Sequence, residues 1–144
     1  VIILLQLPVA YLVRKLPALP TMIGGIGIGT LGMSMLGISP SIWVFITGLI
    51  LFSLGEMTAH PKFISYVAVT APEDQKGVYM GTQFLYGVFG SAIGSVLGAR
   101  LYVLWVDGAG KPARLWFFFT ALGMATMVAL FLFDRVSTSR RKTT

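Results

Sequence analysis

Long apolar stretches separated by short polar turns are the feature that most restricts the folds open to this chain. The apolar stretches cover residues 1–13, 22–38, 41–70, 78–105 and 115–133. A membrane-spanning helix needs about 20 mostly apolar residues, each adding about 1.5 Å. Because lipid offers no hydrogen-bond partners to the backbone, such stretches form helices. We therefore predict an all-α, polytopic transmembrane helical bundle of five spans, the first one truncated at Val1, as in a fragment cut inside a helix.

The composition agrees with a membrane protein and excludes several other classes. Hydrophobic residues make up 56% of the chain and charged residues 11%, and cysteine is absent. Disulfides and thiolate metal sites are thereby excluded. The sequence also lacks metal-ligand spacings, phosphate-binding loops and a Ser/His/Asp set with a second acid inside the spans. We predict no enzyme activity, no metal and no cofactor.

The net charge of +6 is explained by membrane topology rather than by nucleic-acid binding. The basic residues lie at the ends of the apolar stretches, and one side of the predicted bundle collects most of them: Arg14, Lys15, Lys76, Arg135, Arg140, Arg141 and Lys142. The positive-inside rule places that side in the cytoplasm. We predict a multi-pass protein of the cell (inner or plasma) membrane, with the lipid bilayer as partner and residues 137–144 as a basic cytoplasmic tail.

Two basic residues, Lys62 and Arg100, fall inside or near the ends of predicted spans. Long cationic side chains in such positions can extend along the apolar surface and hold their charge at the membrane–water interface. We therefore expect both side chains to snorkel.

Glycine is frequent, with 17 residues in 144, and it recurs at helical spacing. Gly25 and Gly29 form a small-residue stripe that lets helix backbones approach closely in lipid. A formal match to a dinucleotide-binding fingerprint over residues 27–32 lacks the required strand and acidic residue, so we take it as chance. In the 78–105 span the small face consists of Gly87, Gly90, Gly94 and Gly98. It predicts either static packing or a surface on which helices slide.

Glu56 lies near the middle of the 41–70 span, where a charge is costly and usually functional. It could relay a proton, meet a positive group of a substrate, or be a structural carboxyl bonded to a neighbouring helix. His60 shares its helix face one turn away and could extend a proton relay. Pro61 removes a helical hydrogen bond and can kink the span. Gln83, in the next span, is a further polar side chain that could line a wet interior.

The same region resembles a known family. Leu54-Gly55-Glu56, Pro61, Ala71-Pro72 and Gly77-x-x-Met80-Gly81-x-x-Phe84-Leu85 look like helices ten and eleven of the major facilitator superfamily. More narrowly they resemble the proton-dependent oligopeptide transporter family. The resemblance implies that five spans correspond to helices eight to twelve of twelve, and that the missing N-terminal half of the transporter is a partner.

The resemblance also implies a function. Members of the family are secondary transporters whose two halves rock about a central site. The resemblance implies that Glu56 would contact the amino group of a peptide. The family's helix-eleven tryptophan is replaced by Gln83, and its serine before the proline by His60. We predict proton-coupled symport of small solutes such as di- and tripeptides, with Glu56, His60, Gln83 and Phe84 as substrate or proton-coupling residues. The alternatives are a drug or metabolite antiporter and a non-transporting membrane subunit in which Glu56 is structural.

Overall fold

The computed structural model describes residues 2–141 and contains five α-helices. They are α1 (Ile2–Val13), α2 (Ala18–Ile38), α3 (Ile42–Thr70), α4 (Lys76–Tyr102) and α5 (Pro112–Arg141). A 3-10 turn at Glu73–Gln75 precedes α4, and a π-helical turn at Val103–Asp107 follows it. No strand occurs within residues 2–141. The prediction of an all-α helical bundle is confirmed.

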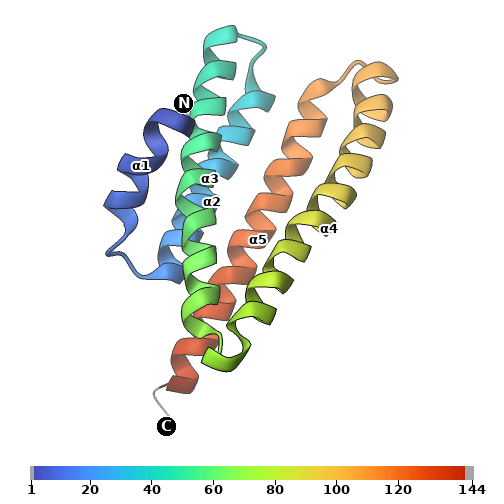
Figure 1. Cartoon of the computed structure of the whole chain (residues 1–144). Helices are drawn as coiled ribbons and strands as arrows, with labels where there is room; N and C mark the ends of the chain where they lie inside the picture. Colours follow the sequence, from blue (N-terminus) through green and yellow to red (C-terminus); the bar gives the residue numbers. More distant parts are fainter. Residues whose placement is uncertain (1, 142–144) are drawn as a thin grey trace.

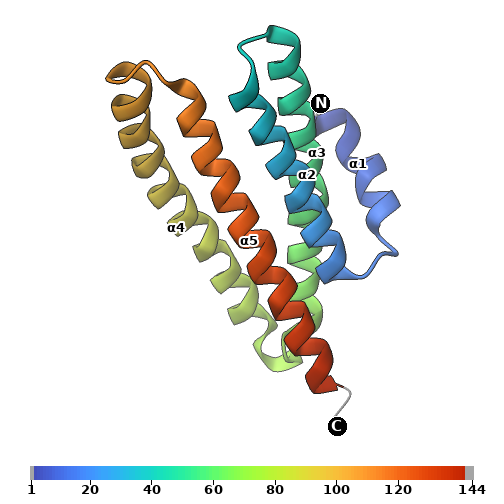
Figure 2. The same ribbon diagram turned by 180° about the vertical axis from the view of Figure 1, so that it is seen from behind.

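The helices form an open bundle whose long members run up and down side by side (Figures 1 and 2). Helix α3 packs most extensively on α2, and α5 lies against the other side of α2. Helix α1 lies beside α3, away from α5 (Figure 1). Helix α4 meets α3 at the end of the bundle where the chain turns at residues 71–75, and from there it diverges from α3 (Figure 1). The molecule therefore has a tight α2–α3–α5 centre and a loosely attached α4.

Glycines bring α2 and α3 into direct backbone contact. A Cβ atom added at Gly25 would lie 2.9 Å from both the Ala59 nitrogen and the Gly55 carbonyl oxygen. At Gly32 the added Cβ would lie 2.5 Å from the Gly48 carbonyl oxygen. These separations are shorter than any real Cβ contact, so only glycine fits at these positions. The close approach predicted for the α2 glycine stripe is confirmed, and in the absence of a hydrophobic driving force in lipid such contact is what holds the two helices together.

The glycines of α4 behave differently. Gly87, Gly90 and Gly94 have no heavy atom within 4 Å of an added Cβ, and Gly98 has only the Phe119 ring at 3.7 Å. Within residues 2–141 this face therefore has almost no packing partner. The role in packing predicted for these four glycines stays a prediction.

Four helical segments are long and apolar enough to cross a membrane: Ala18–Ile38, Ile42–Thr70, Glu73–Asp107 and Pro112–Ser137. Helix α1 covers 12 residues. The outer surface carries large exposed apolar side chains, including Trp43 and Phe84, each 76% exposed. Lipid tails suit such a surface better than water does.

The ends of the helices depart in places from the predicted spans. Helix α5 continues to Arg141, so much of the predicted tail 137–144 continues the last helix. Helix α3 passes through Pro61 without a break. The parts of the predictions that concern Val1 and residues 142–144 fall outside the described residues.

Candidate functional site

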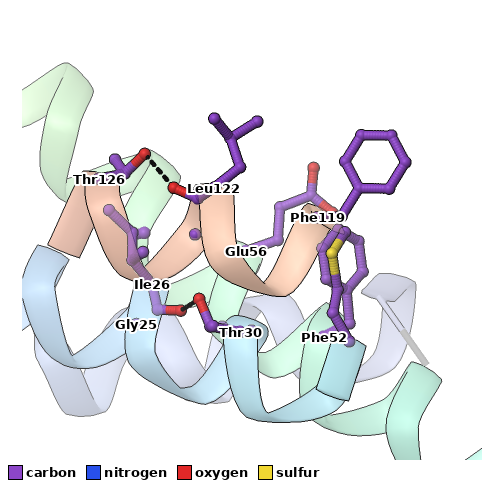
Figure 3. Close-up of a pocket in the computed structure, with 13 residues that line it drawn as sticks. Gly25, Ile26, Thr30, Phe52, Glu56, Phe119, Leu122 and Thr126 are labelled. Carbon is purple, nitrogen blue, oxygen red and sulfur yellow. Dashed lines mark hydrogen bonds between the residues drawn. The ribbon is translucent and has the colours of Figure 1, made fainter. Parts of the chain in front are cut away.

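Glu56 of α3 lines an open cavity of about 330 Å³ to which α2, α3 and α5 all contribute residues (Figure 3). Helix α2 contributes Gly25 and Gly29 to the wall, and α5 contributes Gly123. A Cβ added at Gly25 would meet the α3 backbone, and one added at Gly123 would meet the Thr30 side chain. These glycines therefore set how closely the three helices approach around the cavity.

The wall of this cavity is almost entirely apolar apart from Glu56. Phe52 and Phe119 line the same cavity as Glu56, and all three are labelled in Figure 3. The two threonines in the wall use their hydroxyls within their own helices: Thr30 Oγ1 donates to the Ile26 carbonyl oxygen at 2.8 Å, and Thr126 Oγ1 donates to that of Leu122 at 2.9 Å. The Glu56 carboxylate is therefore the charged group of the cavity, and no side chain among residues 6–137 forms a hydrogen bond or ion pair with it.

Glu56 also borders a smaller cavity of about 150 Å³ on the side of α1. Gln6 of α1 and His60 and Pro61 of α3 line this space with it. Glu56, His60 and Pro61 thus border the same space, as expected for residues about one helical turn apart. Both Glu56 and His60 are exposed, so this face of α3 is open in the described chain.

His60 connects α3 to α4. Its Nδ1 lies 3.3 Å from the Tyr86 hydroxyl, and the tautomer decides which group donates. The Tyr86 ring packs edge-on against Phe63, with ring centroids 4.9 Å apart. Tyr86 was absent from the residues predicted from the sequence, because a tyrosine in an aromatic-rich span has no distinguishing pattern.

Gln83 and Phe84 occupy different surroundings from Glu56. Gln83 lies one turn before Tyr86 and lines a cavity of about 410 Å³ between α3 and α4, together with Phe63 and Tyr79. Its Oε1 is buried without a hydrogen-bond partner among the described residues. Phe84 is 76% exposed. The four residues predicted to act together therefore divide into a Glu56–His60 group, a separate Gln83 cavity and an outward-facing Phe84.

The Lys62 side chain extends to the α1–α2 connection. Its side chain is only 8% exposed, and its ammonium group donates to backbone carbonyls of the α1–α2 connection. The sequence shows a lysine within a span but not the carbonyls that approach it in the fold. Arg100, by contrast, is exposed on α4.

Within the residues that the structure describes, no group of three or more His, Cys, Asp or Glu side chains could hold a metal ion. The arrangement provides a carboxylate that can exchange a proton or pair with a cation, in apolar surroundings rich in phenylalanine.

Comparison with known proteins identifies the family. The sequence profile described as "Major Facilitator Superfamily" matches residues 1–144. The chain belongs to the major facilitator superfamily. Together with the apolar helices, this membership makes it part of a multi-pass membrane protein and confirms the superfamily resemblance and the fold.

Several curated proteins are similar to this superfamily member. "Multidrug resistance protein MdtH" of Klebsiella pneumoniae is 32% identical over 109 residues, which are 76% of this chain and 27% of that protein. The protein of the same name from Proteus mirabilis is 31% identical over 113 residues, with the same coverage. Human "Solute carrier organic anion transporter family member 4C1" is 29% identical over 72 residues, 50% of this chain and 10% of that protein.

The chain spans about a quarter of the length of its multidrug-resistance relatives. No solved structure matches it. The narrower resemblance to oligopeptide transporters is not borne out by these similarities, and peptide symport remains a prediction.

Proposed function

We propose that this chain contributes to a secondary active transporter that exchanges protons for small organic solutes by alternating access. The observation that carries the proposal is the single carboxylate of Glu56 in an apolar, phenylalanine-lined cavity between three helices. We propose no catalytic activity for it. Its partners would be protons, the solute, the lipid bilayer and the remainder of the transporter, which would cover the open face of α3.

The chemistry of an isolated carboxylate explains how protons and solute would be coupled. In apolar surroundings an ionised carboxylate is costly unless a cation compensates it, and a protonated carboxyl is not. One carboxylate cannot hold a proton and a cationic group at the same time. Binding of a cation would therefore release a proton, and binding of a proton would release the cation, which is the rule for antiport.

The aromatic side chains suggest the kind of cation. Phe52 and Phe119 line the same cavity as Glu56, and aromatic faces attract cations in addition to burying apolar surface. An organic cation with a sizeable apolar part would satisfy both the carboxylate and the rings. The names of the multidrug-resistance relatives support a drug as the solute.

Peptide symport is the second candidate, supported by the Leu54-Gly55-Glu56 and Ala71-Pro72 resemblance. In that case Glu56 would pair with the amino terminus of the peptide, and the transported proton would need another site. We propose the same membrane orientation for both candidates. The end of the bundle with Arg14, Lys15 and Lys76 would face the cytoplasm, and so would the C-terminus.

The test uses the full-length protein that contains this chain, reconstituted in liposomes with an imposed proton gradient. Transport of a labelled lipophilic cation, tetraphenylphosphonium, is compared with uptake of a labelled dipeptide. Glu56→Gln removes the charge with little change in shape. Glu73→Gln is the matched control, because that side chain is 95% exposed and pairs only with Lys76 at 3.4 Å.

Gradient-driven movement of the cation against the proton flow, lost in Glu56→Gln and kept in Glu73→Gln, is the expected result. Dipeptide uptake with the same dependence on Glu56 would favour symport instead. Normal transport of either solute by Glu56→Gln would contradict the role proposed for the carboxylate and would favour a structural one.

A further inference from the structure

Lys62 makes a contact that links distant parts of the chain. Its Nζ donates to the Leu16 carbonyl oxygen at 2.8 Å and to the Arg14 carbonyl oxygen at 3.1 Å. Both acceptors belong to the connection that follows α1, and they precede Lys62 by 46 and 48 residues. The lysine is 8% exposed, so the contact is shielded from water.

The carbonyls explain why a buried ammonium group is tolerated there. Backbone carbonyl oxygens in a turn have no partner in a helix, and a cationic donor forms stronger hydrogen bonds with them than a neutral donor does. At the end of α1 the chain turns through hydrogen bonds from the Arg14 nitrogen to the Tyr11 oxygen and from the Leu16 nitrogen to the Val13 oxygen. This turn leaves the oxygens of Arg14 and Leu16 free for Lys62. A lysine of α3 thus binds two backbone carbonyls of the connection that follows α1.

Helix α1 has little else that fixes it at this end. Leu7, Tyr11 and Leu12 are between 73% and 80% exposed, and the contacts of α1 within the described chain are mainly with α3. Pro17 of the connection lines a cavity of about 290 Å³ together with Tyr66, which lies one turn after Lys62 on α3. Among the described residues, the two charge-assisted hydrogen bonds of Lys62 are the side-chain hydrogen bonds that join the α1–α2 connection to α3.

We propose that Lys62 is a clasp that fastens the end of α1 and the α1–α2 connection to α3, so that these parts move as one body. The proposal that these parts move together rests on the proposed transport function, because only a transporter that changes conformation needs the two helices to move together. The clasp itself can be tested without any transport. It differs in kind from the glycine contacts of α2 and α3, because one side chain can remove it.

The experiment is hydrogen exchange on the full-length protein in detergent, without substrate. Lys62→Met keeps the length of the side chain and removes its charge and donors. Lys62→Arg keeps the charge and the donors. Lys111→Met is the matched control, on an exposed lysine in the connection before α5. The amides of residues 14–16 report on the clasp, and those of residues 25–32 report on the α2–α3 centre.

Exchange of the 14–16 amides should become about tenfold faster or more in Lys62→Met, because lost charge-assisted hydrogen bonds ease local opening. The 25–32 amides should keep their protection, and Lys111→Met should match the wild type. Unchanged exchange at 14–16 in Lys62→Met would overturn the proposal. If Lys62→Met loses protection everywhere, recovery in Lys62→Arg supports the clasp and the absence of recovery overturns it.

A separate measurement addresses movement. In the transport assay, Lys62→Met should lower the maximal rate and leave the half-saturating solute concentration unchanged, because the residue lies outside the Glu56 cavity. A normal rate together with fast 14–16 exchange would refute the joint movement. Absence of transport by the wild-type protein would instead count against the proposed function and leave the exchange result standing.

Discussion

The contact between α2 and α3 makes a sharp prediction at two neighbouring residues. Gly25 and Gly24 differ only in the direction they face on the same helix. An alanine Cβ at Gly25 would lie 2.9 Å from two backbone atoms of α3, whereas one at Gly24 would have no heavy atom within 4 Å. The backbone of a helix cannot yield locally as a side chain can. Gly25→Ala therefore forces the two helices apart, and Gly24→Ala leaves them in place.

The magnitudes follow from overpacking and from helix propensity. Overpacking a tight contact costs about 1–3 kcal/mol of stability. Alanine is favoured over glycine within a helix by up to about 1 kcal/mol, and this gain applies to both variants. Since it cancels in the comparison, we expect Gly25→Ala to be less stable than Gly24→Ala by about 1–3 kcal/mol.

Equilibrium unfolding of the full-length protein in mixed micelles, followed by tryptophan fluorescence, measures this difference. Wild type, Gly24→Ala and Gly25→Ala are compared under one set of conditions. Equal stability of the two variants would refute the argument, because the backbones of α2 and α3 would then not be in contact at Gly25.

Two further contacts can be tested in the same assay. A Cβ at Gly123 would meet the Thr30 side chain rather than backbone. Gly123→Ala should therefore destabilise the protein, and Thr30→Ala should relieve part of that cost, with a coupling energy of about 0.5–3 kcal/mol. Strictly additive effects of the two substitutions would argue against this α2–α5 contact. Tyr86→Phe removes the hydroxyl 3.3 Å from His60 Nδ1 and should lower the free energy of unfolding by about 1 kcal/mol. Tyr102→Phe is the control, because no hydrogen bond of the Tyr102 hydroxyl is found in the described chain, and it should lower that free energy less. Equal losses would show that the His60 contact contributes nothing.

The helical architecture could be predicted from the sequence because lipid leaves a long apolar stretch few alternatives. The length of each stretch decides that it is a helix, and the turns at residues 39–41 and 71–75 decide where it ends. The helix bounds differ most at α5, which continues to Arg141. Polar residues there continue a helix that the apolar pattern alone would have ended earlier.

Which glycines make contact could not be predicted in the same way. Gly25 and Gly90 both belong to small-residue stripes at four-residue spacing, yet only Gly25 meets another backbone within the described chain. Spacing shows that a helix has a face open to close approach. Whether another helix occupies that face depends on how the bundle is assembled, which is a property of several segments together.

The candidate site was predictable in its charge and not in its surroundings. A single glutamate within a long apolar stretch identified Glu56, because charge there is rare. Phe52 and Phe119, which line the same cavity, are ordinary members of apolar spans and carry no signal. Lys62 was visible as a charge, but its partners are backbone carbonyls, which every residue possesses and no sequence pattern marks.

The most direct test of the central claim is whether solute binding displaces a proton from Glu56. Full-length protein in lightly buffered detergent is mixed with tetraphenylphosphonium, and proton release is followed with a pH-sensitive dye for wild type, Glu56→Gln and Glu73→Gln. The account predicts release by the wild type and Glu73→Gln and none by Glu56→Gln. Equal release by all three proteins, or binding of the cation without release by the wild type, would contradict it.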